Sequence, residues 1–154
     1  MTEAAKARLR NAGFTDGQIL ALSTVFVEKP VETVEKPNFW QFVKHFKREE
    51  FACKCGGDCD GYPTEMDEDL VLFLDDLRED TGAACVISSG LRCSLHNLRV
   101  GGVKNSYHQY GRAADFTLSG WNSTNIINHI ANMKKSVDII ELYAIDGSYV
   151  HIAI

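Results

Sequence analysis

The chain has 154 residues, of which 45% are hydrophobic and 24% are charged. This length allows one domain with a real core, and this composition excludes a disordered or fibrous protein. A net charge of −5 and a pI near 5.5 argue against a nucleic-acid partner or an anionic membrane surface, since both partners need a basic face. No apolar run reaches the roughly 18 to 20 residues of a membrane span.

Two short helices are expected at the start of the chain. The first covers residues 3–11, and a Thr15-x-x-Gln18 capping box begins the second. The sequence Val-Glu-Lys-Pro then occurs at 27–30 and again at 34–37, which is typical of a stiff, extended connection. We therefore predict a helical segment over 1–26, a charged linker over 27–37 and the main domain over 38–154. We interpret the helical segment as a pair lying against the main domain; the alternative is a docking or targeting module.

The main domain mixes helices and strands. Thr64 is the expected cap of a helix that ends at Gly82 and carries an apolar stripe, and Ser123 is the expected cap of a later helix. Strands are expected at 84–88, at 113–118 and on both sides of a turn at Asp146-Gly147, with a short helix at 94–100. These elements predict an α+β fold in which helices pack on a central antiparallel sheet. The stripe that is expected in its core consists of Met66, Leu70, Phe73, Leu74 and Leu77.

The chain has an odd number of cysteines, so at least one cannot join an internal disulfide. They are Cys53, Cys55, Cys59, Cys85 and Cys93. The first three form a C-x-C-x3-C motif, which lacks the two-residue gap of a common zinc knuckle and would need further ligands. We interpret these residues as reduced or partly paired structural thiols rather than as a second metal site.

His108 and Asp115 form a candidate half of a metal site. Neutral imidazole and carboxylate both bind zinc at about 2.0 to 2.2 Å. The best third ligand is His151, which points to the opposite side from Val150 and Ile152 in the last strand. If the strands of Asp115 and His151 are neighbours, three protein ligands can leave one open position, as a hydrolytic zinc requires.

A longer stretch, SSGLRCSLHNLRVGGVKNSYHQYGRAADF, resembles the signature of the D-alanyl-D-alanine carboxypeptidase family of zinc peptidases. The shared pattern is S-G-x-R, N-x-x-V-G-G, S-x-H-x-x-G-x-A-x-D and a distant V-H near the end. The chain is similar in particular to compact phage and bacterial members that act on cell walls, and the wider clan includes the hedgehog signalling domain. The resemblance covers about residues 38–154 and implies a hedgehog-like or peptidase-like fold.

The resemblance implies Zn²⁺ on His108, Asp115 and His151. Arg92 matches the family's arginine, which implies that it would hold a substrate carbonyl or carboxylate. A guanidinium suits this role because it offers two parallel donors to one planar group. Ser106 either orients His108 or the substrate, or only fixes its turn.

Family members also carry an acidic residue a few positions before the last ligand, which passes a proton from the attacking water to the departing amine. Asp146 is the first candidate here and Glu141 is the second, although Asp146 also begins an Asp-Gly turn. Ala153 departs from the V-H-x-D pattern of many relatives.

The resemblance implies a zinc peptidase that cuts stem or cross-bridge peptides of peptidoglycan, as a D,D-carboxypeptidase or an endolysin-like endopeptidase. The alternative is a catalytically weak or inactive zinc-containing binding module, or part of a larger viral or cell-wall assembly. The start MTEAAKARLR lacks the apolar segment of a secretory signal. We therefore expect synthesis in the cytoplasm and action on the wall after release or by a separate export route. The sequence does not predict the oligomeric state.

Overall fold

The computed structural model describes residues 6–7, 10–25, 38–133 and 137–154. The chain divides into two compact units, Met1–Lys36 and Pro37–Ile154. In the first unit, helix α2 (Asp16–Val25) begins at the predicted capping box: Thr15 N–H donates to Gln18 Oε1 (2.9 Å), and Gln18 N–H donates to Thr15 Oγ1 (3.3 Å). The predicted linker at 27–37 lies outside the described residues, as does part of the expected first helix.

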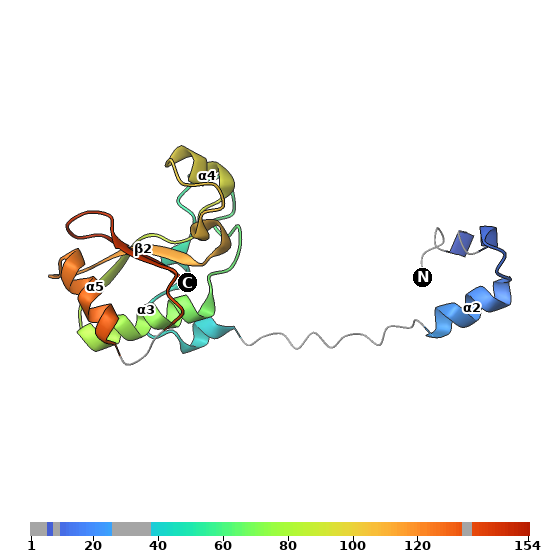
Figure 1. The fold of residues 1–154 in the computed structure, drawn as a ribbon, viewed down its shortest axis with the longest axis horizontal. Helices are drawn as coiled ribbons and strands as arrows, with labels where there is room; N and C mark the ends of the chain where they lie inside the picture. Colours follow the sequence, from blue (N-terminus) through green and yellow to red (C-terminus); the bar gives the residue numbers. More distant parts are fainter. Residues whose placement is uncertain (1–5, 8–9, 26–37, 134–136) are drawn as a thin grey trace. The chain divides into compact units, whose positions relative to one another are not determined.

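The second unit is built on one four-stranded antiparallel sheet with the strand order β1-β2-β4-β3 (Figure 1). The strands are β1 (Cys85–Ser89), β2 (Ala113–Leu118), β3 (Glu141–Ala144) and β4 (Val150–Ala153). This confirms the predicted α+β fold and its antiparallel sheet. The two central strands, β2 and β4, place Asp115 directly opposite His151.

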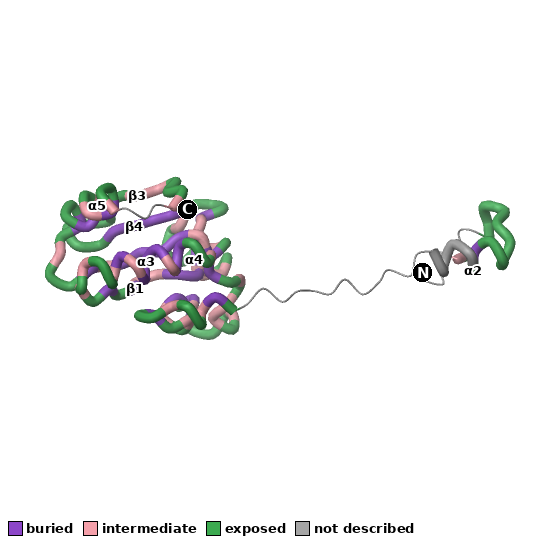
Figure 2. Tube along the Cα trace, turned by 90° about the horizontal axis from the view of Figure 1, so that it is seen from below, coloured by how far each residue is buried: buried purple, intermediate pink, exposed green. Residues whose placement is uncertain are grey.

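The two faces of the sheet differ in chemistry because side chains alternate along each strand. One face carries Phe116, Val150 and Ile152, which are fully buried in the hydrophobic core with the apolar stripe of α3 (Glu68–Thr81). Asp115 and His151 lie on the other face. Figure 2 shows buried stretches in α3 and β4, whereas exposed residues alternate with buried and intermediate ones in α5 (Ser123–Asn132) and α4 (Ser94–Arg99).

Three short 3₁₀ helices complete the domain: Phe39–Phe42, Arg48–Phe51 and Tyr107–Tyr110. The last of these, η3, leads into β2. Among the described residues, no helix has the length and apolar character that crossing a membrane would require.

Some predicted boundaries were wrong. Helix α3 is capped by Asp67, whose carboxylate accepts from Asp69 N–H (3.0 Å), and not by Thr64. The cause is tertiary: Asp67 N–H donates to Gly111 O (2.9 Å), which holds the preceding residues against the loop before β2. Helix α5 is capped by Asn122, one residue before the predicted Ser123. The predicted stripe stays in the core, since Met66, Leu70, Phe73, Leu74 and Leu77 are at most 3% exposed.

Gly111 is where η3 turns into β2, and we expect Gly111→Ala to be strongly destabilising. Its φ is +72°, and an added Cβ would lie 2.1 Å from Glu65 O. Gly120 is the matched control, because its φ is +79° and a Cβ there meets no atom within 4 Å. We expect Gly120→Ala to cost about 1–2 kcal/mol of unfolding free energy from backbone strain, and Gly111→Ala about 3 kcal/mol or more. Urea unfolding measures both, and equal costs would contradict the close approach.

Candidate metal centre

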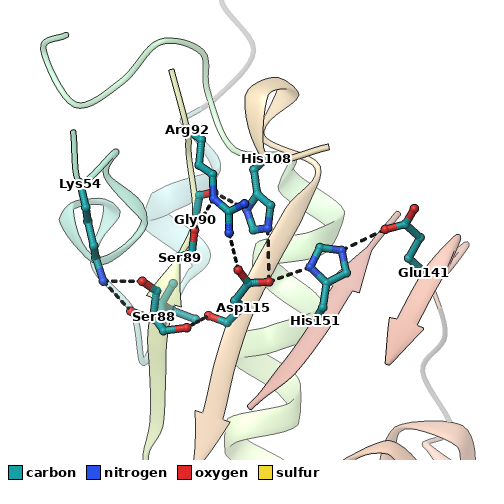
Figure 3. A network of polar contacts seen from close by, with 10 residues as sticks. Lys54, Ser88, Ser89, Gly90, Arg92, His108, Asp115, Glu141 and His151 are labelled. Carbon is teal, nitrogen blue, oxygen red and sulfur yellow. Dashed lines mark hydrogen bonds and ion pairs between the residues drawn. The ribbon is translucent and has the colours of Figure 1, made fainter. Parts of the chain in front are cut away.

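The three predicted metal ligands converge on one point. His108 comes from η3, Asp115 from β2 and His151 from β4, and their ligand atoms all lie within 4.8 Å of one another. Asp115 Oδ1 is 2.6 Å from His151 Nδ1 and 3.3 Å from His108 Nε2 (Figure 3). All three residues are at most 7% exposed. The sheet register explains the convergence, since directly opposed residues of β2 and β4 project from the same face.

The ring orientation of His108 leaves one nitrogen free for a cation. Its Nδ1 lies 2.7 Å from Gly90 O and must donate to it, because a carbonyl oxygen only accepts. In the neutral ring, Nε2 then carries the lone pair; it is buried and makes no hydrogen bond, with Asp115 Oδ1 3.3 Å away. A buried nitrogen without a partner is costly, and a metal ion is one way to satisfy it.

The ring of His151 is oriented by a carboxylate. Its Nε2 is 3.1 Å from Glu141 Oε2, and its Nδ1 faces Asp115. Ligating histidines usually donate their second ring N–H to a carboxylate or carbonyl, which fixes the tautomer. Both histidines have such a partner, so the donor set of two imidazoles and one carboxylate fits Zn²⁺.

Arg92 contacts the metal centre directly. Its Nη2 donates to Asp115 Oδ2 (2.5 Å), its Nε donates to Ser89 Oγ (2.8 Å), and its backbone N–H donates to His108 O (3.0 Å). Burial alone would raise the pKa of Asp115, but the two neighbouring histidines and the charge of Arg92 hold that pKa well below its usual range. The sequence predicted Arg92 as a substrate ligand and missed its contact with Asp115.

Comparison with known proteins identifies the domain. A family model described as Peptidase M15 matches residues 44–153. The chain belongs to the peptidase M15 family. Members of this D-Ala-D-Ala carboxypeptidase-type family are zinc peptidases, so the resemblance seen in the sequence is confirmed and the domain is of the metallopeptidase class. No curated protein sequence matches this chain.

An open cleft of about 600 Å³ lies over the metal centre of the M15 domain. One wall is the segment 101–107, and the other wall is strand β3 and the residue after it. The predicted Ser106 lies in the first wall, where its backbone carbonyl accepts from Gln109 N–H (2.9 Å) and its side chain makes no cap bond to η3. Tyr143, which the sequence did not single out, stacks on His151 with 4.7 Å between ring centroids. The residues that line the cleft floor are Arg92, His108, Asp115 and His151.

The two acidic candidates lie in different places in the M15 domain. Asp146 is exposed in the β3–β4 turn, where its Oδ1 accepts from the backbone N–H groups of Ser148 and Tyr149, each at 2.9 Å. These bonds lower the pKa of Asp146, and this residue does not line the cleft. Glu141 lines the cleft and reaches His151. The structure thus places Glu141, and not Asp146, beside the metal centre.

Proposed function

We propose that the M15 domain hydrolyses a peptide bond in the stem or cross-bridge peptides of peptidoglycan, with Zn²⁺ held by His108, Asp115 and His151. The observation that carries this proposal is a buried His-Asp-His set on the floor of an open cleft, in which the Nε2 atom of His108 makes no hydrogen bond. Zinc in that position would polarise the scissile carbonyl and lower the pKa of a water molecule.

The residues around the centre have separate roles in this proposal. Glu141 accepts a proton from the attacking water and passes it to the departing amine, since its carboxylate borders the cleft and is 42% exposed. Arg92 fixes the orientation of Asp115 and adds positive charge where the substrate oxygen becomes negative. The planar guanidinium of Arg92 carries several N–H donors, so this side chain can hold Asp115 and bind the substrate at the same time.

The family supports a peptide substrate, and the sequence resemblance to compact cell-wall enzymes supports peptidoglycan as its source. The cleft is large enough for a few residues of an extended peptide. Action on the wall after release or separate export belongs to the same proposal.

Digestion of purified peptidoglycan tests the function. We expect the zinc-loaded protein to release fragments with new amino termini, and a chelator to stop the reaction until zinc is restored. Mass spectrometry of the fragments distinguishes the enzyme types: loss of a terminal D-alanine indicates a carboxypeptidase, and an internal cut indicates an endopeptidase. Intact peptidoglycan after treatment with protein that holds its zinc would instead support the zinc-containing binding module.

A further inference from the structure

Four cysteines converge at a second point of the M15 domain, away from the His-Asp-His centre. The Sγ atoms of Cys53, Cys55, Cys59 and Cys93, here called the four-cysteine cluster, all lie within 4.8 Å of one another. All five cysteines of the chain are free thiols, and Cys85 lies outside the cluster. Zinc–sulfur bonds of about 2.3 Å in a tetrahedron place sulfur atoms about 3.8 Å apart. The cluster therefore has the dimensions of a tetrahedral thiolate site.

The first three sulfur atoms meet because of the local backbone. Side chains alternate in an extended chain, so Cys53 and Cys55 are buried on one side while the exposed Lys54 points to the other. Lys54 Nζ donates to Ser88 O (2.7 Å), which fastens this segment to the edge of β1 (Figure 3). Gly56 and Gly57 then take positive φ values of +78° and +111°, which turns the chain back toward the cluster before Cys59.

The fourth sulfur comes from the start of helix α4. Leu91 N–H donates to Phe51 O (2.8 Å), which brings the two segments together. Cys93 N–H then donates to Cys53 Sγ (3.2 Å). Cys93 directly follows Arg92, so a metal bound at the cluster would fasten the residue next to the arginine of the catalytic cleft.

Three of the four sulfur atoms of the cluster accept a hydrogen bond from a backbone N–H group. The N–H of Cys93 donates to Cys53 (3.2 Å), that of Gly61 to Cys59 (3.4 Å) and that of His96 to Cys93 (3.4 Å), and Cys55 Sγ lies 3.5 Å from Cys59 Sγ. A neutral thiol is a weak acceptor, whereas a charged acceptor makes much stronger bonds. The arrangement therefore suits thiolates. Thiolates at these separations repel one another unless a cation lies between them.

We propose that the four-cysteine cluster binds a structural Zn²⁺ through four thiolates, and that the thiol protons are released to solvent on binding. Four protein ligands complete the tetrahedron and leave no position for water or substrate, which makes the site structural and not catalytic. Soft sulfur ligands also disfavour magnesium and calcium. The interpretation of these cysteines as structural thiols rested on a three-cysteine motif, and Cys93 supplies the missing ligand.

Zinc content of purified full-length protein tests the proposal. We expect two zinc ions per chain in the wild type and one in the Cys55→Ser/Cys59→Ser variant, with a melting temperature lowered by about 10 °C or more. Cys85→Ala is the matched control, because it removes a buried cysteine outside the cluster and should keep both ions.

The His108→Ala/His151→Ala variant decides the matter even if the cysteine variant does not fold. It keeps the cluster and should hold one zinc, whose X-ray absorption spectrum shows sulfur neighbours alone at about 2.3 Å. A zinc without sulfur neighbours, iron in its place, or a disulfide within the cluster in the intact mass of freshly purified protein would overturn the proposal. The result is independent of hydrolysis, so an inactive protein with this zinc would refute only the proposed function.

Discussion

The His108→Ala variant is expected to lose peptide hydrolysis by about a thousandfold or more, together with the zinc of the His-Asp-His centre. His108 is 1% exposed and its ring is fixed by Gly90, so no other described side chain is placed to take over its Nε2 position. Two remaining ligands would bind zinc weakly, since catalytic zinc sites use three. Hydrolysis of peptidoglycan fragments and zinc content per chain measure the two losses.

Two further variants separate loss of zinc from loss of fold. His108→Gln keeps more of the buried volume than alanine does, which limits the cavity that a large-to-small substitution leaves. His129→Ala is the matched control, because His129 pairs with Asp80 on the surface (2.8 Å) and does not line the cleft. It should keep activity and zinc. Hydrolysis at the wild-type rate by a His108→Ala protein that lacks this zinc would refute the metal centre.

The convergence of His108, Asp115 and His151 was predicted from the family resemblance together with the alternation of side chains along strands. Alternation along β2 and β4 fixes the face on which Asp115 and His151 project, and the Asp-Gly turn indicates that β4 pairs with β3. The observed register pairs Tyr143 with His151, which the Asp146-Gly147 turn alone does not predict, because Leu142 and His151 are the residues equally far from that turn. It also places Glu141, opposite Ala153, on the face of the metal centre.

The contacts of the two acidic candidates, of Cys93 and of the start of α3 differ from the first expectation, by local turn structure at Asp146 and by tertiary packing at the others. Asp146 is nearer to His151 in sequence than Glu141 is, but the turn directs its carboxylate back to its own backbone. Likewise, Cys93 joins the cluster only because the chain returns after α3 and β1 to pair Leu91 with Phe51. Helix α3 begins later than predicted for a similar reason, because Asp67 N–H donates to Gly111 O. Spacing along the chain carries no information on the last two contacts.

Glu141→Gln is the second variant for which we expect a large loss. The amide retains an oxygen that can accept from His151 Nε2–H, so zinc content should remain at the wild-type level. The amide cannot take up a proton, so kcat should fall by about 10²- to 10⁴-fold if Glu141 is the general base. Glu141→Ala removes the bond to His151 as well and should also weaken zinc binding by about 10- to 100-fold.

Asp146→Asn is the matched control, because it makes the same chemical change in the acidic residue of the turn. Its amide oxygen can still accept the N–H groups of Ser148 and Tyr149, so we expect activity within about twofold of the wild type. A large loss in Asp146→Asn together with an active Glu141→Gln would assign proton transfer to the turn and leave Glu141 with only the orientation of His151. Loss in Glu141→Gln at full zinc occupancy would assign proton transfer to Glu141, since the amide oxygen still accepts the bond that orients the ring of His151.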